Sequence, residues 1–426
     1  MLEIYFKTYG CTANYNSTEI MKGLVRQREL NITENIENAD IIVINSCIVK
    51  TPTEEKIRKQ IQDLLKQDKK IILAGCMSKL CKEKFQKNNL YLLETNNVKK
   101  INDLIKDIIE KNYDERNYLK NGNEVKANLP KISKEKFIGI TQISQGCLNK
   151  CSYCITRLAK GKLFSYPQDK IIQSIENDLN SGCKEIWITS QDNANYGNEN
   201  NEYNLVELLK EILKIKKKFF LRVGMMNPEN VLKILPELIE IYKNKKMFKF
   251  LHIPLQSGND KILKLMNRNY TKKDFIKIIK KFKKEFPEIH ISTDIIVGFP
   301  QETEENFKET YDLIKWLKPE TINFSKFWPR PYTLAGKMKQ VDKKLVKKRI
   351  LKIAKLHKEI CNEKQRKFLN TKHKVLVNQK GFGNTYLARD KNYKLFAVVS
   401  AEKILGKIVE IKVKKITPHY LISEVV

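Results

Sequence analysis

The feature that most restricts the fold is a long alternation of short apolar runs and amphipathic stretches in the central part of the chain. Six runs rich in β-branched and aromatic residues can form strands, and a helical pattern follows each of the first five. These runs are Phe137–Ile143, Glu185–Thr189, Phe219–Val223, Phe250–Pro254, Ile289–Val297 and Thr321–Phe327, and a long helical stretch, Val341–Lys367, closes the series. Alternating strands and helices form parallel sheets, because each helix carries the chain back to the start of the next strand. The pattern predicts a complete or partial (β/α)6 barrel of the TIM type, with its functional face at the carboxyl ends of the strands.

Two smaller regions flank this predicted barrel. Residues 1–115 alternate β-branched runs with amphipathic stretches, which predicts an N-terminal parallel α/β domain of the Rossmann-like kind. The runs are Ile4–Thr8, Ile41–Asn45, Ile71–Ala74 and Leu90–Leu93. A polar, Asn- and Lys-rich linker is expected at residues 112–135, and the barrel domain at 133–367. Five short strand-like runs in residues 368–426 predict a small C-terminal β-barrel, a fold that often binds nucleic acid.

The charge of the chain indicates a polyanionic partner but does not identify one. Lys and Arg number 81 against 49 Asp and Glu, a formal net charge of +32, and 41% of the residues are hydrophobic, enough for packed cores. Of the basic residues 70 are Lys, whereas phosphate recognition by paired hydrogen bonds favours Arg. A nucleic acid partner and a merely solvated, lysine-rich surface therefore both remain open.

The sequence features that are missing predict the cellular location of the protein and the redox state of its cysteines. No run approaches the roughly 18–20 apolar residues of a membrane span, and the N-terminal residues do not resemble a signal peptide. We therefore expect a cytoplasmic protein with no membrane partner. The chain has nine Cys, and in a reducing compartment these serve metal binding, catalysis or packing rather than disulfides.

Three cysteines form a CxxxCxxC motif directly after the first predicted barrel strand: Cys147, Cys151 and Cys154. This spacing suits a loop wrapped around a metal centre, because cysteines in a core follow the helix or strand period. Three ligands leave one iron of a four-iron cluster open to bind S-adenosylmethionine (SAM), and an electron from the cluster can then generate a 5′-deoxyadenosyl radical. The alternative is a zinc site with a distant fourth ligand.

Three further cysteines, Cys11, Cys47 and Cys76, each follow a predicted strand of the N-terminal domain. Because the carboxyl ends of parallel strands meet at one edge of the sheet, these side chains should converge. Gly10 and Gly75 precede two of them and allow a close approach of the backbone. The placement predicts a second iron–sulfur cluster with three protein ligands, and the alternative is three small buried hydrophobic residues. Cys81, Cys183 and Cys361 are expected to be packing residues.

Several polar residues at the predicted strand ends are candidates for SAM contacts. Gln191 and Asp192 could accept hydrogen bonds from the SAM ammonium group, although Asp192 could instead cap a turn. Arg222 could pair with a carboxylate of SAM or substrate, or form a structural ion pair. The remaining candidates at strand ends are His252, Gln256 and Asp294. Phe327, Trp328 and Arg330 could hold an unstacked base or pack under the barrel rim.

These motifs together resemble the radical-SAM methylthiotransferases, nearly end to end. The segments that carry the resemblance are Thr8–Asn16, Asn45–Thr51, Ala74–Met77, Gly146–Cys154, Thr189–Gly197, Leu251–Gly258 and Asp294–Thr303, and the C-terminal segment resembles their RNA-binding TRAM domain. The resemblance implies two 4Fe–4S clusters and two SAM molecules per turnover. One SAM would methylate a sulfur held at the N-terminal cluster, and the other would supply the radical that removes hydrogen from the target carbon.

The segments Cys151–Pro167 and Phe327–Val341 resemble the archaeal and eukaryotic branch of that family. That branch implies methylthiolation of carbon 2 of N6-threonylcarbamoyladenosine at tRNA position 37, next to the anticodon. It also implies the tRNA anticodon arm, a ferredoxin- or flavodoxin-like electron donor and a sulfur source as partners. The branch usually has Arg-Gly where this chain has Lys160-Gly161, and Gly where it has Tyr332.

Two alternatives to this function remain at the level of sequence. One is methylthiolation of isopentenyladenosine in tRNA or of an Asp on a ribosomal protein. The other is an iron–sulfur protein that binds RNA and senses redox state without turnover.

Overall fold

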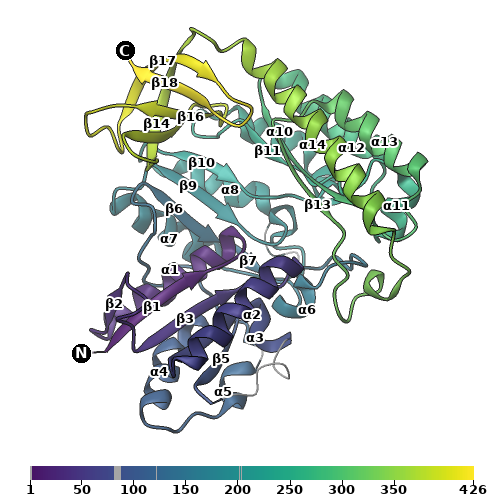
Figure 1. Cartoon of the computed structure of the whole chain (residues 1–426). Helices are drawn as coiled ribbons and strands as arrows, with labels where there is room; N and C mark the ends of the chain where they lie inside the picture. Colours follow the sequence, from purple (N-terminus) through teal and green to yellow (C-terminus); the bar gives the residue numbers. More distant parts are fainter. Residues whose placement is uncertain (1, 81–87, 121, 201, 203) are drawn as a thin grey trace.

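The structure is a computed structural model of the chain and describes residues 2–80, 88–120, 122–200, 202 and 204–426 (Figure 1). The N-terminal part is a five-stranded parallel sheet in the order β2-β1-β3-β4-β5, with apolar clusters and helices on both faces. Its elements are β1 (Glu3–Thr8), α1 (Thr12–Gln27), β2 (Asn31–Thr33), β3 (Ile41–Ser46), α2 (Thr51–Lys66), β4 (Lys70–Gly75), α3 (Cys76–Leu80), β5 (Leu90–Glu94) and α4 (Ile101–Ile109). The predicted parallel α/β domain and its four strands are confirmed; β2 is an edge strand too short to leave a sequence pattern.

The central part is a partial barrel made of two three-stranded parallel sheets, β10-β9-β6 and β11-β12-β13 (Figure 1). The strands are β6 (Ile138–Gln142), β9 (Glu185–Thr189), β10 (Phe220–Val223), β11 (Phe250–His252), β12 (His290–Val297) and β13 (Thr321–Lys326). Backbone hydrogen bonds from Leu221 to Lys246 and from Phe248 to Leu221 join the two sheets. All six predicted strands are present within two residues of the expected bounds.

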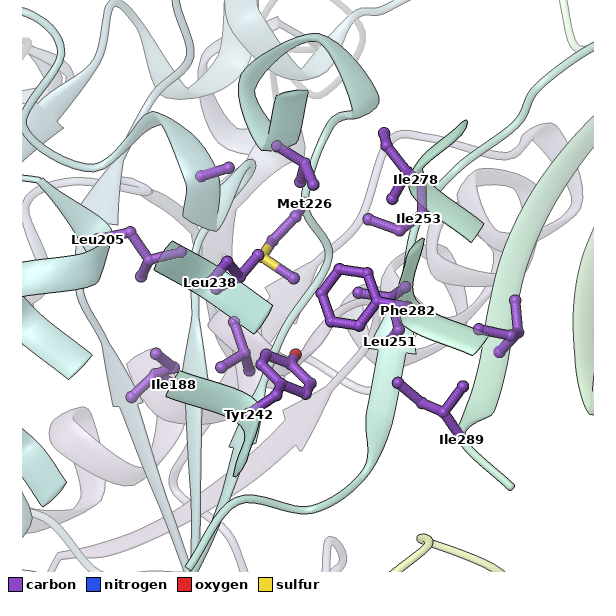
Figure 2. Close-up of a cluster of buried hydrophobic side chains, with 14 of the residues drawn as sticks. Ile188, Leu205, Met226, Leu238, Tyr242, Leu251, Ile253, Ile278, Phe282 and Ile289 are labelled. Carbon is purple, nitrogen blue, oxygen red and sulfur yellow. The ribbon is translucent and has the colours of Figure 1, made fainter. Parts of the chain in front are cut away.

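The helices of the partial barrel lie on its outer side. They are α7 (Gln168–Asn180), α8 (Leu205–Lys214), α9 (Pro228–Lys233), α10 (Leu235–Lys243), α11 (Asp260–Leu265), α12 (Lys272–Glu285), α13 (Glu304–Leu317) and α14 (Lys343–Arg366). Figure 2 shows the core between strands and helices, where Ile188 and Leu251 from the sheets meet Tyr242 and Phe282 from α10 and α12. Tyr242 keeps its hydroxyl satisfied by donating to the carbonyl of Phe250 at 3.0 Å. Each such buried side chain contributes roughly 1.5–3 kcal/mol.

The C-terminal part is a closed five-stranded barrel in the order β14-β15-β16-β18-β17, as predicted (Figure 1). Its strands are β14 (Lys372–Lys380), β15 (Thr385–Arg389), β16 (Leu395–Val399), β17 (Ile408–Ile416) and β18 (Leu421–Val425). It packs against the amino ends of the central strands: Asn378 donates to Glu185 at the start of β9, and Tyr393 contacts the rings of Phe248 and Phe250. The carboxyl ends of the central strands are therefore left free for a site.

The segment predicted as a linker is partly ordered. It contains a short helix, α5 (Glu115–Leu119), whose first turn is capped by the Asp114 carboxylate. Tyr113 stacks on Tyr118 and contacts the edge of Tyr91, so a polar composition conceals an aromatic contact with the N-terminal sheet. Among the described residues, no helix combines the length and the apolar character that a membrane crossing requires.

Candidate active site

Three thiols converge at the carboxyl edge of the N-terminal sheet, as the sequence predicted. Cys11 precedes α1, Cys47 follows β3, and Cys76 begins α3 directly after β4. A Cβ on Gly10 would lie 2.9 Å from the Cβ of Cys47, and a Cβ on Gly75 would lie 2.6 Å from the carbonyl of Ser46. Both glycines have positive φ, so only Gly lets these loops approach one another so closely.

Asn14 and Ser46 fix the three loops to each other. The Asn14 side chain donates to the carbonyl oxygens of Tyr9 at 2.8 Å and Ser46 at 2.9 Å, which joins the loops after β1 and β3. Ser46 Oγ donates to the carbonyl of Ala74 at 2.6 Å and accepts from the amide of Met77 at 3.0 Å, which joins the loop after β4. The loops that carry the thiols are therefore positioned by buried hydrogen bonds before any ligand binds.

The second set of thiols lies on the loop after β6. Gly146 begins it with positive φ, and a Cβ there would lie 1.8 Å from the carbonyl of Lys162, so no other residue fits. Ser152, between Cys151 and Cys154, is held by its amide and its hydroxyl to the carbonyl oxygens of Met266 and Leu265 at 3.0 and 2.7 Å. The loop is thus fixed to the carboxyl side of the barrel.

The donor chemistry of both sets fits an iron–sulfur cluster. All six cysteines are free thiols, and the charges of neighbouring thiols act on one another within each set. Burial raises the pKa of Cys76 and of Cys147 to about 12, so iron binding would have to displace their protons. Among the described residues no three His, Cys, Asp or Glu side chains are arranged for a single metal ion. A four-iron cluster does not need three side chains around one ion, because each thiolate binds a separate iron.

Arg268 is a site residue that the sequence did not reveal. It follows α11, and its Nη1 lies 3.3 Å from the Sγ of Cys151 while its Nη2 donates to Asn227 Oδ1 at 2.7 Å. The amide of Asn227 in turn donates to Asp192 Oδ1 at 2.9 Å. A cation beside a thiolate stabilises the negative charge of a cluster. Its only sequence signal is its rarity, as one of few Arg in a lysine-rich chain.

The predicted SAM residues Gln191 and Asp192 lie on the loop after β9, beside the barrel thiols. Asp192 caps a short turn by accepting from the amide of Ala194, and it also accepts from the Asn149 side chain of the cysteine loop at 3.4 Å. Gln191 Oε1 and Ser190 Oγ are buried, and neither has a hydrogen-bond partner in the part of the chain that the structure describes. Since buried polar atoms are normally satisfied, this loop has hydrogen-bonding capacity that fits the amino group of SAM.

His252, Asp294 and Gln256 lie together at the carboxyl ends of β11 and β12. His252 Nε2 is 3.1 Å from both carboxylate oxygens of Asp294, which also accepts from Asn323 at 2.8 Å. Burial raises the pKa of Asp294, but the hydrogen bonds from His252 and Asn323 outweigh it, and the pKa lies below its usual value. Asp294 therefore presents a negative charge beside Gln256, which adopts positive φ.

Arg222 has a different environment. Its guanidinium lies over the rings of Trp187 at 4.8 Å, Phe250 at 4.7 Å and Tyr393 of the C-terminal barrel at 5.5 Å. The aromatic faces stabilise the cation, and the buried Glu185 carboxylate also lies close enough to interact with its charge. The aromatic neighbours account for the position of Arg222 without SAM. A contact between Arg222 and SAM stays a prediction.

A cleft of about 240 Å³ separates the N-terminal domain from the mouth of the barrel. Val49 and Lys50, just after Cys47, line one side, and Cys154, Asp294 and Trp328 line the other. Of the residues expected to hold a base or to pack under the barrel rim, Phe327 lines the cleft and also packs against Phe299 in a small apolar cluster. Arg330, which lines the cleft, forms an ion pair with Glu54 of the N-terminal domain. The ammonium nitrogen of Lys326 lies over the Trp328 ring, 4.0 Å from the ring centroid.

The remaining cysteines behave as packing residues where they are described. Cys183 and Cys361 are buried, and Cys361 lies 3.3 Å from the Nε2 of His357. Cys81 lies outside the described residues. Tyr332, where the resembled branch usually has Gly, adopts the positive φ that Gly favours.

Comparison with known families covers most of the chain. Residues 141–314 match the Radical SAM superfamily, residues 3–93 match a family described as Uncharacterized protein family UPF0004, and residues 366–426 match the TRAM domain. A Pyrococcus horikoshii protein named "probable threonylcarbamoyladenosine tRNA methylthiotransferase" is 39% identical over 100% of both chains. The human threonylcarbamoyladenosine tRNA methylthiotransferase is 33% identical over 98% of this chain and 73% of its own length. The chain belongs to the threonylcarbamoyladenosine tRNA methylthiotransferase family.

Membership of this family confirms the expected cofactors, SAM and 4Fe–4S clusters. Solved structures confirm the fold of the methylthiotransferase chain. The radical S-adenosylmethionine methyltransferase TsrM from Kitasatospora setae, with cobalamin and a [4Fe-4S] cluster bound, matches with a TM-score of 0.57 over 79% of this chain and 77% of its own at 13% identity. The cobalamin-dependent radical enzyme OxsB matches with a TM-score of 0.55 over 84% of this chain and 56% of its own, also at 13% identity.

Proposed function

We propose that this protein methylthiolates carbon 2 of N6-threonylcarbamoyladenosine at position 37 of tRNA. The observation that carries the proposal is a cleft lined by Cys154 of the barrel thiols and by Val49 and Lys50, which follow Cys47 of the N-terminal thiols, in a chain related end to end to proteins named for this reaction. When bound, the clusters and SAM supply the sulfur, the methyl group and the removal of hydrogen from the target carbon. Cys11, Cys47 and Cys76 hold the first cluster, and Cys147, Cys151 and Cys154 the second.

The residues around the cleft bind and orient rather than exchange protons. Gln191 and Asp192 accept hydrogen bonds from the SAM ammonium group. Asp294 and Gln256 line the cleft, where they contact either the opposite end of SAM or the substrate. The Arg330–Glu54 pair closes the cleft between the two domains. Since the cleft is bounded by protein on both sides, the target base must leave its stack to enter it.

A tRNA substrate is consistent with the positive net charge of the chain, because tRNA is a polyanion. Lysine excess supplies sequence-independent attraction to phosphates, and the anticodon loop offers an unpaired base that can be splayed out. The C-terminal barrel carries Phe382 at a hairpin tip, 96% exposed and flanked by Gly381 and Gly383. An exposed aromatic ring on a basic barrel is a platform for a base of the anticodon arm. A ferredoxin- or flavodoxin-like protein would supply electrons, and a separate donor the sulfur.

An anaerobic assay with reconstituted clusters tests the proposal. Purified protein, SAM, sulfide and reductant are incubated with threonylcarbamoylated tRNA, and the digested nucleosides are analysed by mass spectrometry. The 2-methylthio form of threonylcarbamoyladenosine should appear. A parallel reaction contains tRNA bearing isopentenyladenosine, and if only that tRNA is modified, the substrate assignment is wrong. If SAM is never cleaved, the protein is not this enzyme.

Two matched variants separate the roles of the thiols. With Cys147, Cys151 and Cys154 all changed to Ala, both the product and 5′-deoxyadenosine should be lost. With Cys11, Cys47 and Cys76 changed instead, the methylthio product should be lost while SAM cleavage to 5′-deoxyadenosine continues. Equal loss of SAM cleavage in both variants would contradict the division of labour between the two sets.

A further inference from the structure

A buried lysine faces the N-terminal thiols from the opposite domain. Lys160 ends α6 (Thr156–Lys160), the short helix that follows the barrel cysteines. This helix packs on α3, and its Ala159 shares an apolar cluster with Cys76 and Met77. Packing of α6 on the cysteine edge therefore carries the Lys160 side chain away from the barrel and into the N-terminal site.

The ammonium group of Lys160 is buried without a partner. The residue is 2% exposed, and its Nζ has no hydrogen-bond partner among the described residues. Burying an unpaired charge costs several kcal/mol, so a native site keeps one only where an anion compensates it. The backbone carbonyl of Lys160 accepts from the Asn96 side chain at 3.2 Å, so the unpaired group is the ammonium at the end of the side chain.

The charged groups around Lys160 identify where that anion lies. Those that act on it are the thiols of Cys76, Cys11 and Cys47, the Glu94 carboxylate and the ammonium of Lys126. Lys126 is itself satisfied, because its Nζ donates to the carbonyl of Thr95 at 2.7 Å. Glu94 is fully buried and accepts from the Asn96 amide through Oε2, while its Oε1 has no hydrogen-bond partner among the described residues and makes no ion pair with Lys160 within 4 Å. The positive charge of Lys160 therefore faces the three thiols and Glu94, and the thiols of Cys76 and Cys11 act on it more strongly than Glu94 does.

We propose that Lys160 binds the anionic sulfur species, a hydrosulfide or its methylated thiolate, that the N-terminal cluster carries at its open iron. The inference rests on the proposed function, since it requires a cluster on Cys11, Cys47 and Cys76. A cluster with three thiolates and a fourth sulfur ligand is an anion, and the ammonium supplies both a counter-charge and three N–H donors. Lys160 thereby favours retention of sulfur and favours the reduced, more negative state of the cluster.

The test uses the full-length chain with Cys147, Cys151 and Cys154 changed to Ser, so that only the N-terminal cluster is present. Four proteins are compared: this parent and its Lys160→Met, Lys160→Arg and Lys162→Met derivatives. Lys162 is exposed two residues further along, so Lys162→Met removes the same charge from the solvent side. Iron content, the reduction potential followed by electron paramagnetic resonance, and sulfide affinity from the cluster spectrum are measured without SAM or tRNA.

We expect Lys160→Met to weaken sulfide binding at least tenfold and to shift the reduction equilibrium at least tenfold towards the oxidised cluster, about 59 mV for one electron. Lys160→Arg should retain both properties, and Lys162→Met should leave them unchanged. A Lys160→Met protein that loses iron while Lys160→Arg keeps it also supports the inference, because the two differ in charge. Unchanged sulfide affinity and potential in iron-loaded Lys160→Met, equal shifts in Lys162→Met, or iron loss in both Lys160 variants would overturn it. Absence of iron from the parent would instead overturn the proposed function.

Discussion

Neutralising Glu54, which forms an ion pair between the N-terminal domain and the barrel, should lower the free energy of unfolding more than removing its partner Arg330. Arg330, 5% exposed, lies on the loop after β13 and reaches α2, where it pairs with Glu54 and donates to Thr51 Oγ1 at 3.1 Å. Glu54 has a second arginine: Arg58 Nε donates to it at 3.0 Å. Among the described residues, Glu54 is the only carboxylate in an ion pair with Arg330. Substituting Glu54 and substituting Arg330 should therefore lower the free energy of unfolding by different amounts.

The magnitudes follow from what each substitution leaves behind. Glu54→Gln leaves a buried guanidinium without a carboxylate, which costs about 3–5 kcal/mol of unfolding free energy. Arg330→Met leaves Glu54 paired with Arg58, so the loss is that of a charged hydrogen bond, about 1.5–3 kcal/mol. The double variant should cost less than the sum of the two, since neither unpaired charge remains.

Anaerobic urea unfolding of the parent, both single variants and the double variant measures these differences at pH 7. Burial raises the pKa of Glu54, but the hydrogen bonds from Arg330 and Arg58 outweigh it, and the pKa lies below its usual 4.5. The contribution of the pair is therefore complete above pH 4.5 and should disappear as the pH falls through the lower pKa of the folded state. If Arg330→Met proves as costly as Glu54→Gln, or if the two losses simply add, the assigned asymmetry is wrong.

Three further predictions concern other parts of the chain. Phe382→Ala should weaken tRNA binding by about 1–3 kcal/mol in fluorescence anisotropy, whereas Leu351→Ala, exposed on α14, should not; equal effects would exclude stacking. Burial raises the pKa of Glu19 to about 7 from 4.5. The folded state then loses stability as the pH rises between these values, so Glu19→Gln should gain about 3 kcal/mol at pH 8 and little at pH 4 in urea unfolding; a gain independent of pH would refute this. Gly146→Ala, whose Cβ would lie 1.8 Å from the Lys162 carbonyl, should lower the iron content of the barrel site; full iron loading would contradict the fit.

The elements that the sequence predicted well are those with a strong local pattern. The strand Glu185–Thr189 lies where predicted because its buried residues form a short β-branched run between a Gly-containing turn and a polar loop. The convergence of Cys11, Cys47 and Cys76 was also predictable, since parallel strands necessarily share a carboxyl edge. In both cases the inference needs only the chain's own periodicity and one topological rule.

The contacts between domains were not predictable, because no local pattern encodes them. Asn16 donates to the carbonyl of Ile140 at 2.7 Å and so fixes α1 to β6, yet no periodicity or spacing in the sequence indicates that these two residues meet. Arg268 and Cys151 are far apart in the sequence and meet only because α11 returns to the cysteine loop. The surroundings of Arg222 were not predictable either. Its position near a strand end suggested a contact with SAM or substrate, which stays a prediction, and its neighbours in the structure include the ring of Tyr393 from another domain.

The lysine excess shows most clearly what burial adds to composition. From the sequence alone, 70 lysines indicate a solvated surface that attracts RNA in a general way. Lys126 and Lys160 contradict that description, since both are buried and act on one another beside Cys76. Burial and the charge of Lys160 lower the pKa of Lys126 to about 7, so near neutral pH Lys126 is only partly protonated beside the charged Lys160. A site that concentrates positive charge away from water is built to receive an anion. The residue type that supplies general attraction on the surface therefore supplies a specific binding group when α6 carries it into the space beside the thiols.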